Sequence, residues 1–193
     1  MTLPLRVAMA GSSGVGKTTL AKFISETYDV PCNPVGSRSV AAQMGFDVSP
    51  YDVDKAGRRA EFQARLLQEK VAWEQTQDSF VTDRTTADNL TYTALHDVHS
   101  ITSATLERAS MGLARYTHIF LCEMDSFFDP GSDSARVKDK SYHLVFEACL
   151  KGVLMAHTGA SRPPLVFRVV RGSTLEERKA YVKRVIDNVR GDL

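Results

Sequence analysis

A glycine-rich stretch near the start, Gly11 to Thr19, constrains this chain more than any other feature. It reads Gly-Ser-Ser-Gly-Val-Gly-Lys-Thr-Thr and fits the pattern G-x-x-x-x-G-K-[ST] without a mismatch. The run before it, Leu5 to Ala10, has the length and apolar character of a buried strand. The run after it, Leu20 to Ser25, opens a helical pattern. A strand, this loop and a helix in that order predict a loop that cradles phosphate groups.

The chemistry of this loop assigns a role to each part of it. Glycines let the backbone N–H groups wrap around a polyphosphate, and the helix that starts near Lys17 adds the positive end of its dipole. Lys17 is expected to reach the β and γ phosphates, and the Thr18 hydroxyl is expected to ligate Mg²⁺. The residues predicted to bind ATP are Ser13, Gly14, Val15, Gly16, Lys17, Thr18 and Thr19. The motif is the Walker A loop of P-loop NTPases, so the chain is expected to bind a nucleoside triphosphate.

Size and composition indicate a single globular domain over residues 1–193. With 24 Lys and Arg against 23 Asp and Glu, the net charge is +1, so bulk charge does not favour a nucleic acid or a membrane as partner. Cys32, Cys122 and Cys149 lack C-x-x-C spacing, which argues against a disulfide scaffold and a zinc site. No apolar run has membrane-spanning length and no signal peptide precedes the first strand, so we expect a cytoplasmic protein, monomeric or homodimeric.

Strands and helices alternate along the chain. Apolar runs predict strands at 5–10, 79–82, 117–122 and 165–170, with a weaker one at 30–33 that Pro31 and Pro34 interrupt. Helical patterns are predicted at 17–28, 37–44, 56–77, 87–94, 105–115, 142–157 and 174–189, the last opened by a capping box of Thr174 and Glu177. This alternation is typical of a three-layer α/β/α fold with a parallel sheet of about five strands.

An acidic residue at the end of a predicted strand marks a second chemical site. Asp83 ends the strand at 79–82, at the sheet edge where ligands bind in open α/β folds. An aspartate there can hold Mg²⁺ or accept the proton of an acceptor hydroxyl, and its position at the strand end favours these roles over the alternative, a cap of the next helix. Arg84 follows directly and can clamp a phosphate group or form an ordinary salt bridge.

Together, the glycine-rich loop and the segment Asp83-Arg84-Thr85-Thr86-Ala87-Asp88-Asn89-Leu90-Thr91-Tyr92 resemble one group of P-loop kinases. That group includes nicotinamide-riboside kinase-like proteins and is related to thymidylate and deoxynucleoside kinases. The resemblance implies that Asp88 and Tyr92, which share a helix face, lie near the acceptor pocket. The equal alternative is that Asp88 is an exposed acid and Tyr92 a core aromatic. The resemblance also implies substrate contact for Arg38, for which a surface charge is an equal alternative. One departure is the absence of the acid that deoxynucleoside kinases carry after their second strand, where this chain has Asn33 to Gly36.

Two further loops follow from the same resemblance. The segment 127–140 lies where these kinases have a lid, and its basic residues Arg136, Lys138 and Lys140 are candidates to stabilise the transferring phosphoryl group, Arg136 first. A solvated charged loop explains it equally well. The residues Arg171 to Thr174, after the last strand, correspond to the adenine-binding loop.

The leading hypothesis is an ATP-dependent kinase that acts on a hydroxyl or phosphate of a nucleoside, a nucleotide or a modified base in DNA. The last option resembles the phage 5-hydroxymethyluracil DNA kinases and needs a basic groove, for which Arg38, Arg58, Arg59 and Arg65 are candidates. The alternative is a regulatory ATPase or nucleotide-sensing switch without a phosphoryl acceptor. The chain lacks both the N-K-x-D motif of GTPases and a strand that ends in D-E, which favours the kinase.

Overall fold

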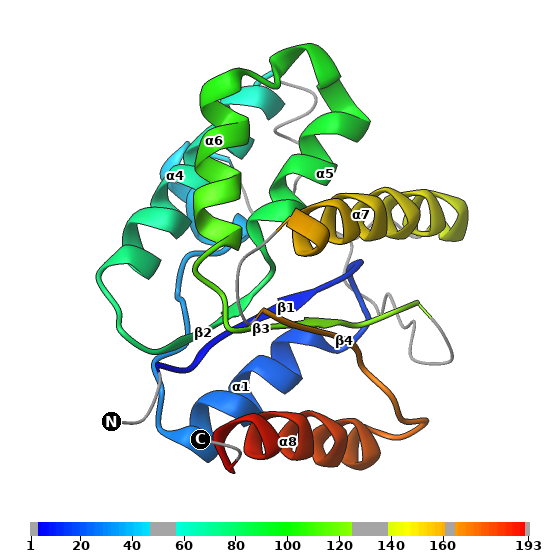
Figure 1. Ribbon diagram of the computed structural model, residues 1–193. Helices are drawn as coiled ribbons and strands as arrows, with labels where there is room; N and C mark the ends of the chain where they lie inside the picture. Colours follow the sequence, from blue (N-terminus) through cyan, green and yellow to red (C-terminus); the bar gives the residue numbers. More distant parts are fainter. Residues whose placement is uncertain (1–3, 47–56, 125–138, 161–164, 192–193) are drawn as a thin grey trace.

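The computed structural model describes residues 4–46, 57–124, 139–160 and 165–191, and Figure 1 shows the arrangement of their helices and strands. Strands and helices alternate along the chain, as the hydrophobic pattern predicts. The strands are β1 (Arg6–Ala10), β2 (Phe80–Asp83), β3 (His118–Leu121) and β4 (Val166–Val169). The helices are α1 (Lys17–Tyr28), α2 (Ser37–Gln43), α4 (Arg59–Gln75), α5 (Thr86–Asp97), the 3₁₀ turn η1 (Val98–Ser100), α6 (Ser103–Leu113), α7 (Lys140–Ala160) and α8 (Leu175–Gly191).

The four strands form one parallel sheet in the order β2-β1-β3-β4. The predicted fold class is confirmed, but the described sheet is smaller than the expected five strands. The segment around Cys32 makes only an isolated bridge to Val81. Asn33 N donates to Val81 O at 2.8 Å, but Pro31 and Pro34 have no N–H to extend the ladder.

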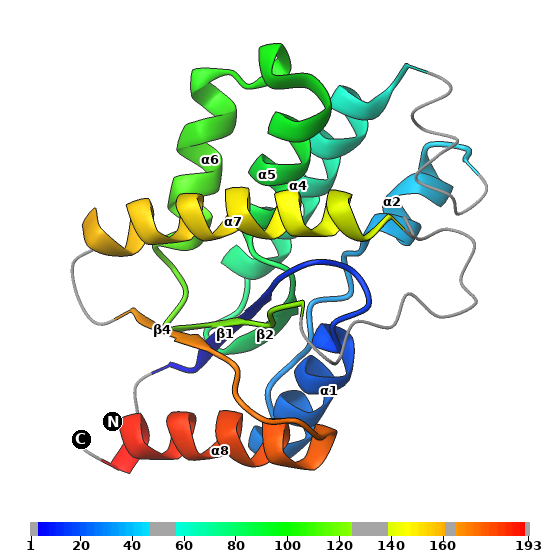
Figure 2. The ribbon, with the colours of Figure 1, turned by 90° about the vertical axis from the view of Figure 1, so that its right-hand side faces the viewer.

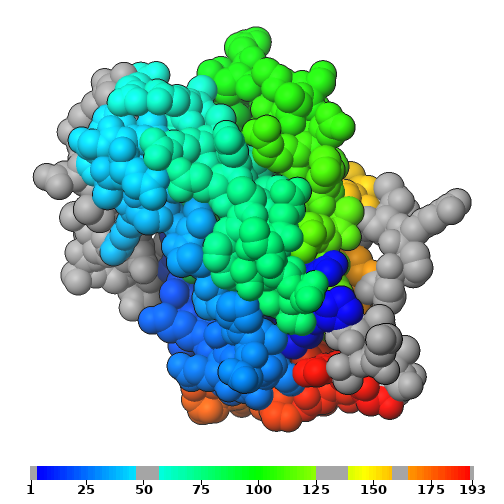
Figure 3. Space-filling model, turned by 90° about the vertical axis from the view of Figure 1, so that its left-hand side faces the viewer, coloured from blue at the N-terminus to red at the C-terminus, as the bar shows by residue number. Residues whose placement is uncertain are grey.

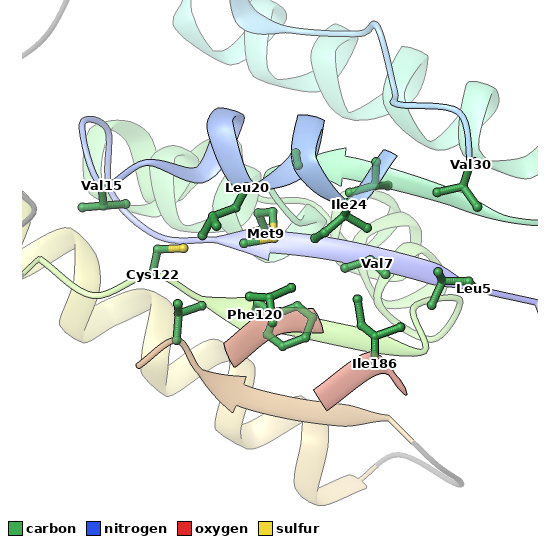
Figure 4. Packing of buried hydrophobic residues seen from close by; sticks show 14 residues of the cluster. Leu5, Val7, Met9, Val15, Leu20, Ile24, Val30, Phe120, Cys122 and Ile186 are labelled. Carbon is green, nitrogen blue, oxygen red and sulfur yellow. The ribbon is translucent and has the colours of Figure 1, made fainter. Parts of the chain in front are cut away.

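Helices cover both faces of the sheet (Figures 1 and 2). Helices α1 and α8 lie on one face, while α5 and α7 lie on the other. Side chains of β1 alternate between the two: Val7 and Met9 join the core with α1 and α8, and Ala8 and Ala10 join the core with α5 and α7. Figure 4 shows the first of these cores, in which Leu20 and Ile24 of α1 pack against β1. Because both faces are buried, β1 is apolar along nearly its whole length.

Outside the sheet, α4, α5 and α6 pack against one another, and Figure 3 shows the outer surface that α4 and α6 form. A groove between α4 and α6 is lined by Gln68, Val71, Ala72, Gln75, Ala104, Glu107, Arg108 and Met111. Within the described ranges, no helix is both long and apolar enough to cross a membrane.

Candidate functional site

The glycine-rich loop joins the carboxyl end of β1 to the start of α1, as its pattern predicts. Gly11 has φ 131°, and a Cβ atom there would lie 2.3 Å from the carbonyl oxygen of Cys122 at the end of β3. Gly16 caps α1 with φ 82°. Both positions require glycine, the first for conformation and for close approach, the second for conformation. The loop therefore lies against the edge of the sheet with the N-terminus of α1 directed into it, which is the geometry of an anion-binding loop.

Lys17 is buried at the base of this loop, with 5% of its surface exposed. Its ammonium group donates a hydrogen bond to the carbonyl oxygen of Ser12. Burial and the nearby Arg84 guanidinium lower the pKa of Lys17 to about 8, although Asp83 and Asp88 partly oppose the shift. The Lys17 ammonium is poorly solvated and is repelled by the Arg84 guanidinium. A bound anion would stabilise both charges, so this environment favours the binding of phosphate.

Asp83 lies beside Thr18, the threonine of the loop. The Thr18 hydroxyl donates to Oδ2 of Asp83, whereas Oδ1 of Asp83 is buried and has no hydrogen-bond partner within the described residues. The alternative role as helix cap is filled by Thr85, which is the N-cap of α5. A buried carboxylate oxygen without a partner, next to a threonine hydroxyl, fits a site for a hard cation such as Mg²⁺.

Asp88 has no exposed surface and holds three parts of the site together. Its Oδ2 accepts hydrogen bonds from the N–H and the hydroxyl of Thr85 at 2.9 and 2.6 Å, which completes the capping box of α5. Its Oδ1 accepts from Gly11 N and from Arg84 Nη1, both at 3.3 Å. Asp88 thus positions the glycine-rich loop and Arg84, and its own oxygens do not face an open pocket in this conformation.

Arg84 has an unusual backbone conformation, with φ 94°. Its Nη1 also donates to the carbonyl oxygen of Gly11 at 3.3 Å, and its guanidinium lies 5.0 Å from the centre of the Tyr92 ring. Burial disfavours the charge, but Tyr92, Asp88 and Asp83 together raise the pKa of Arg84 above its ordinary value. The Arg84 guanidinium is therefore permanently charged and is held next to the glycine-rich loop. The Arg84 side chain keeps 25% of its surface exposed. A left-handed φ at a residue that is not glycine is typical of functional sites.

Tyr92 lies one helical turn after Asp88 on the same face of α5, as the spacing predicts. Its ring packs against Phe146 of α7, with 4.3 Å between the ring centres. Burial raises the pKa of Tyr92, although the Arg84 charge opposes the shift. Tyr92 therefore helps to hold the Arg84 guanidinium between α5 and the loop. Through its contact with Phe146, it also connects Arg84 to α7.

Two residues that the sequence did not single out contact the loop from distant elements. His143, in the first turn of α7, shares a hydrogen bond of 2.5 Å with the Ser12 hydroxyl. Arg178, in the first turn of α8, is 2% exposed and donates to Val15 O at 3.0 Å. Both contacts span more than 130 positions of the chain, at separations of 131 and 163 residues, so no local motif predicts them.

The sequence analysis also did not predict a buried polar cluster that forms between α4 and β2. Glu74 accepts hydrogen bonds from Asn33 at 3.2 Å and from the Tyr116 hydroxyl at 3.1 Å, and it pairs with Lys70 at 2.9 Å. The Lys70 ammonium also donates to the Thr82 hydroxyl. Asn33 therefore belongs to a cluster that ties α4 to β2.

The other predicted site residues are placed as follows. Arg38 is exposed on α2. Arg136 and Lys138 lie outside the described residues, while Lys140 is the first residue of α7 and not part of a loop. The predicted capping box after β4 is confirmed, since Thr174 N donates to Glu177 at 3.1 Å and Glu177 N donates to Thr174 at 3.2 Å. The described residues contain no group of three or more His, Cys, Asp or Glu that could hold a metal ion.

The fold is shared with several structures of low sequence identity. NadR in complex with NR superposes with a TM-score of 0.68 at 12% identity, covering 98% of this chain and 51% of NadR, so the chain spans about half of that protein. Deoxyadenosine kinase from M. mycoides, with products dCMP and dCDP bound, superposes with a TM-score of 0.67 at 12% identity, covering 96% of this chain and 100% of the enzyme. Shikimate kinase from Acinetobacter baumannii in complex with shikimate reaches 0.60 at 12% identity, covering 98% of this chain and 96% of the kinase.

None of the curated protein sequences compared with the chain matches it. A family of known domains does match, over residues 6–189, from the first strand through the last helix. The matched range contains the glycine-rich loop, Asp83 and the helices that hold them, and the structure has the P-loop kinase fold. On this evidence the chain belongs to the AAA domain family AAA_28.

Proposed function

We propose that this protein is an ATP-dependent phosphotransferase that moves the γ-phosphoryl group of ATP to a hydroxyl or phosphate of a nucleoside-like acceptor. The observation that carries the proposal is the contact between Thr18 and Asp83, which brings a carboxylate to the mouth of a complete phosphate loop. Two structures with this fold support the choice of acceptor, because NadR is in complex with NR and deoxyadenosine kinase holds the products dCMP and dCDP.

ATP would bind along the loop from Ser13 to Thr19, with its phosphates against the backbone N–H groups and the α1 N-terminus. On binding, the Lys17 ammonium would exchange the Ser12 carbonyl for the β and γ phosphates. Mg²⁺ would be held by Thr18, Asp83 and the phosphates, and when bound it neutralises charge on the transferring group. The loop at Arg171–Thr174 would receive the adenine.

The transfer step needs a proton acceptor and cations around the phosphoryl group. An acceptor hydroxyl would lose its proton to Asp83 while its oxygen forms a bond to the γ-phosphorus, and the bond to the β–γ bridging oxygen breaks to release ADP. Lys17 and Arg84 would stabilise the charge on the transferring oxygens. Arg136 is proposed to add a further cation in the transition state.

Asp83 is a better candidate for the base than Asp88. Both oxygens of Asp88 already accept protein hydrogen bonds, whereas one oxygen of Asp83 has none among the described residues. We therefore propose that Asp88 acts on the acceptor side through Arg84, with Tyr92 and Arg38 completing the substrate pocket.

The test is transfer of labelled phosphate from ATP to three sets of acceptors: free nucleosides, nucleoside monophosphates, and DNA that contains 5-hydroxymethyluracil. We expect transfer to a nucleoside or nucleotide. A DNA acceptor is less favoured because Arg58 and Arg65 are paired with Glu61 and Glu69, each at 2.7 Å, which reduces the charge available to phosphates. Hydrolysis of ATP without transfer to any acceptor would contradict the proposal and indicate a regulatory ATPase.

A further inference from the structure

The first turn of α7 is fastened to the glycine-rich loop through a buried pair of side chains. His143 is 1% exposed and Ser12 is 0% exposed, and Nδ1 of His143 shares a hydrogen bond with the Ser12 hydroxyl at 2.5 Å. Ser12 is the first variable position of the motif, and the motif itself sets no requirement there. The contact therefore comes from the packing of α7 over the sheet (Figure 2).

Helix α7 is anchored to the same edge of the sheet at a second point. Glu147, one turn after His143, accepts a hydrogen bond from Met124 N at 2.6 Å, just beyond β3. Lys151 bridges Glu123 and Glu147 at 2.6 and 2.9 Å. These contacts fix the N-terminal half of α7, so His143 is a rigid partner for Ser12 and not a mobile one.

Ser12 links His143 to the loop lysine. Its hydroxyl bonds to His143, while its carbonyl oxygen accepts from the Lys17 ammonium. A hydrogen bond that fixes the Ser12 side chain also restricts the peptide groups on either side of it. Those peptide groups begin the cradle that has to receive the phosphates, and a preorganised cradle binds more tightly because less conformational entropy is lost on binding.

We propose that His143 is a positioning residue that preorganises the phosphate loop for nucleotide binding. The inference rests on the proposed use of this loop as the ATP site. His143 acts through Ser12 and does not touch the phosphates itself. Because the contact uses Nδ1, the ring nitrogen next to Cγ, an asparagine side chain can place a polar atom at nearly the same position, whereas leucine fills the space without one.

The test measures the dissociation constant of Mg·ATP, without any acceptor, for four variants: His143→Leu, His143→Asn, Ser12→Ala and the double variant Ser12→Ala/His143→Leu. We expect His143→Leu to weaken binding about tenfold, equivalent to about 1.4 kcal/mol. The Asn variant should stay within about twofold of the wild type. The double variant should bind no more weakly than His143→Leu, because removal of both partners leaves no buried hydroxyl unsatisfied.

A matched control is His157→Leu, the same substitution at the other end of α7, which should leave the affinity for Mg·ATP unchanged. The proposal is overturned if Asn and Leu at position 143 weaken binding equally, if the losses of the two single variants add, or if no variant changes affinity. Thermal unfolding of each variant identifies any that fails to fold, and Ser12→Ala then tests the contact from the loop side. If the wild-type protein binds Mg·ATP but transfers no phosphate to any acceptor, the proposed function is refuted. The affinity measurements still decide whether His143 preorganises the loop.

Discussion

The hydroxyl of Thr18 donates a hydrogen bond to the carboxylate of Asp83 and so joins two parts of the chain that are 65 residues apart. The sheet register makes this contact, because β1 and β2 are parallel neighbours in which Met9 is paired with Asp83. The phosphate loop continues from β1 just beyond that point. A nucleotide phosphate held by the loop would therefore lie close to Asp83 and Arg84 at the carboxyl end of β2.

The first prediction concerns Asp83. Asp83→Asn keeps the size of the side chain and its bond from Thr18 but removes the negative charge and the basicity. We expect kcat to fall on the order of a hundredfold or more, as for the loss of a general base, with little change in the melting temperature. Steady-state kinetics with the best acceptor measure this effect. If kcat for Asp83→Asn stays near the wild-type value, the base lies elsewhere.

The second prediction concerns Lys17. Lys17→Ala removes the cation that is expected to stabilise the transferring phosphoryl group, and the buried Lys17 side chain lies outside the two hydrophobic cores that flank the sheet. We expect phosphoryl transfer to become undetectable, while circular dichroism and thermal unfolding remain close to wild type. Appreciable turnover by a folded Lys17→Ala protein would show that the loop does not serve catalysis in the proposed way.

The third prediction is a pH dependence of nucleotide affinity. Burial and the Arg84 charge lower the pKa of Lys17 to about 8, so the free protein carries the ammonium at pH 7 and loses it as the pH rises above 8. Mg·ATP requires the ammonium, so binding at higher pH must take up a proton. The dissociation constant should therefore rise by about tenfold per pH unit above pH 8.

Calorimetric titration with Mg·ATP between pH 7.5 and pH 9.5 measures this dependence. The phosphate groups do not titrate in that range, since the second pKa of a phosphate monoester lies near 6. Lys17→Ala is the control: it should bind weakly at every pH, with a flat profile. A flat profile for the wild type would argue against a depressed pKa of Lys17.

The fourth prediction separates two glycines by their surroundings. At Gly11, φ is 131° and a Cβ atom would lie 2.3 Å from the Cys122 carbonyl, so Gly11→Ala should destabilise the fold by about 2 kcal/mol or more. Gly152 lies within α7, where a Cβ atom meets nothing within 4 Å. Gly152→Ala should therefore stabilise the fold by about 0.5–1 kcal/mol. Urea denaturation compares the two free energies of unfolding, and equal effects would contradict the described loop geometry.

The sequence by itself determined the parts of the protein that depend on neighbours along the chain. The position of the glycine-rich loop and the helix Lys17–Tyr28 were predicted as observed, because strand, glycines and helix start follow one another directly. The capping box of Thr174 and Glu177 also follows from a local spacing. The parallel three-layer fold follows from the alternation of apolar strands with amphipathic helices, which leaves few other ways to bury both kinds of surface.

Tertiary structure alone decided which residues meet across the site. The segment around Cys32 became a single bridge because prolines withhold N–H groups, and Asp88 became a buried anchor because Gly11 and Arg84 converge on it. The contact of His143 with Ser12 depends on where α7 crosses the sheet. Hydrogen bonds between distant segments form only after the core has set the distances between them, and no spacing within the sequence encodes that geometry.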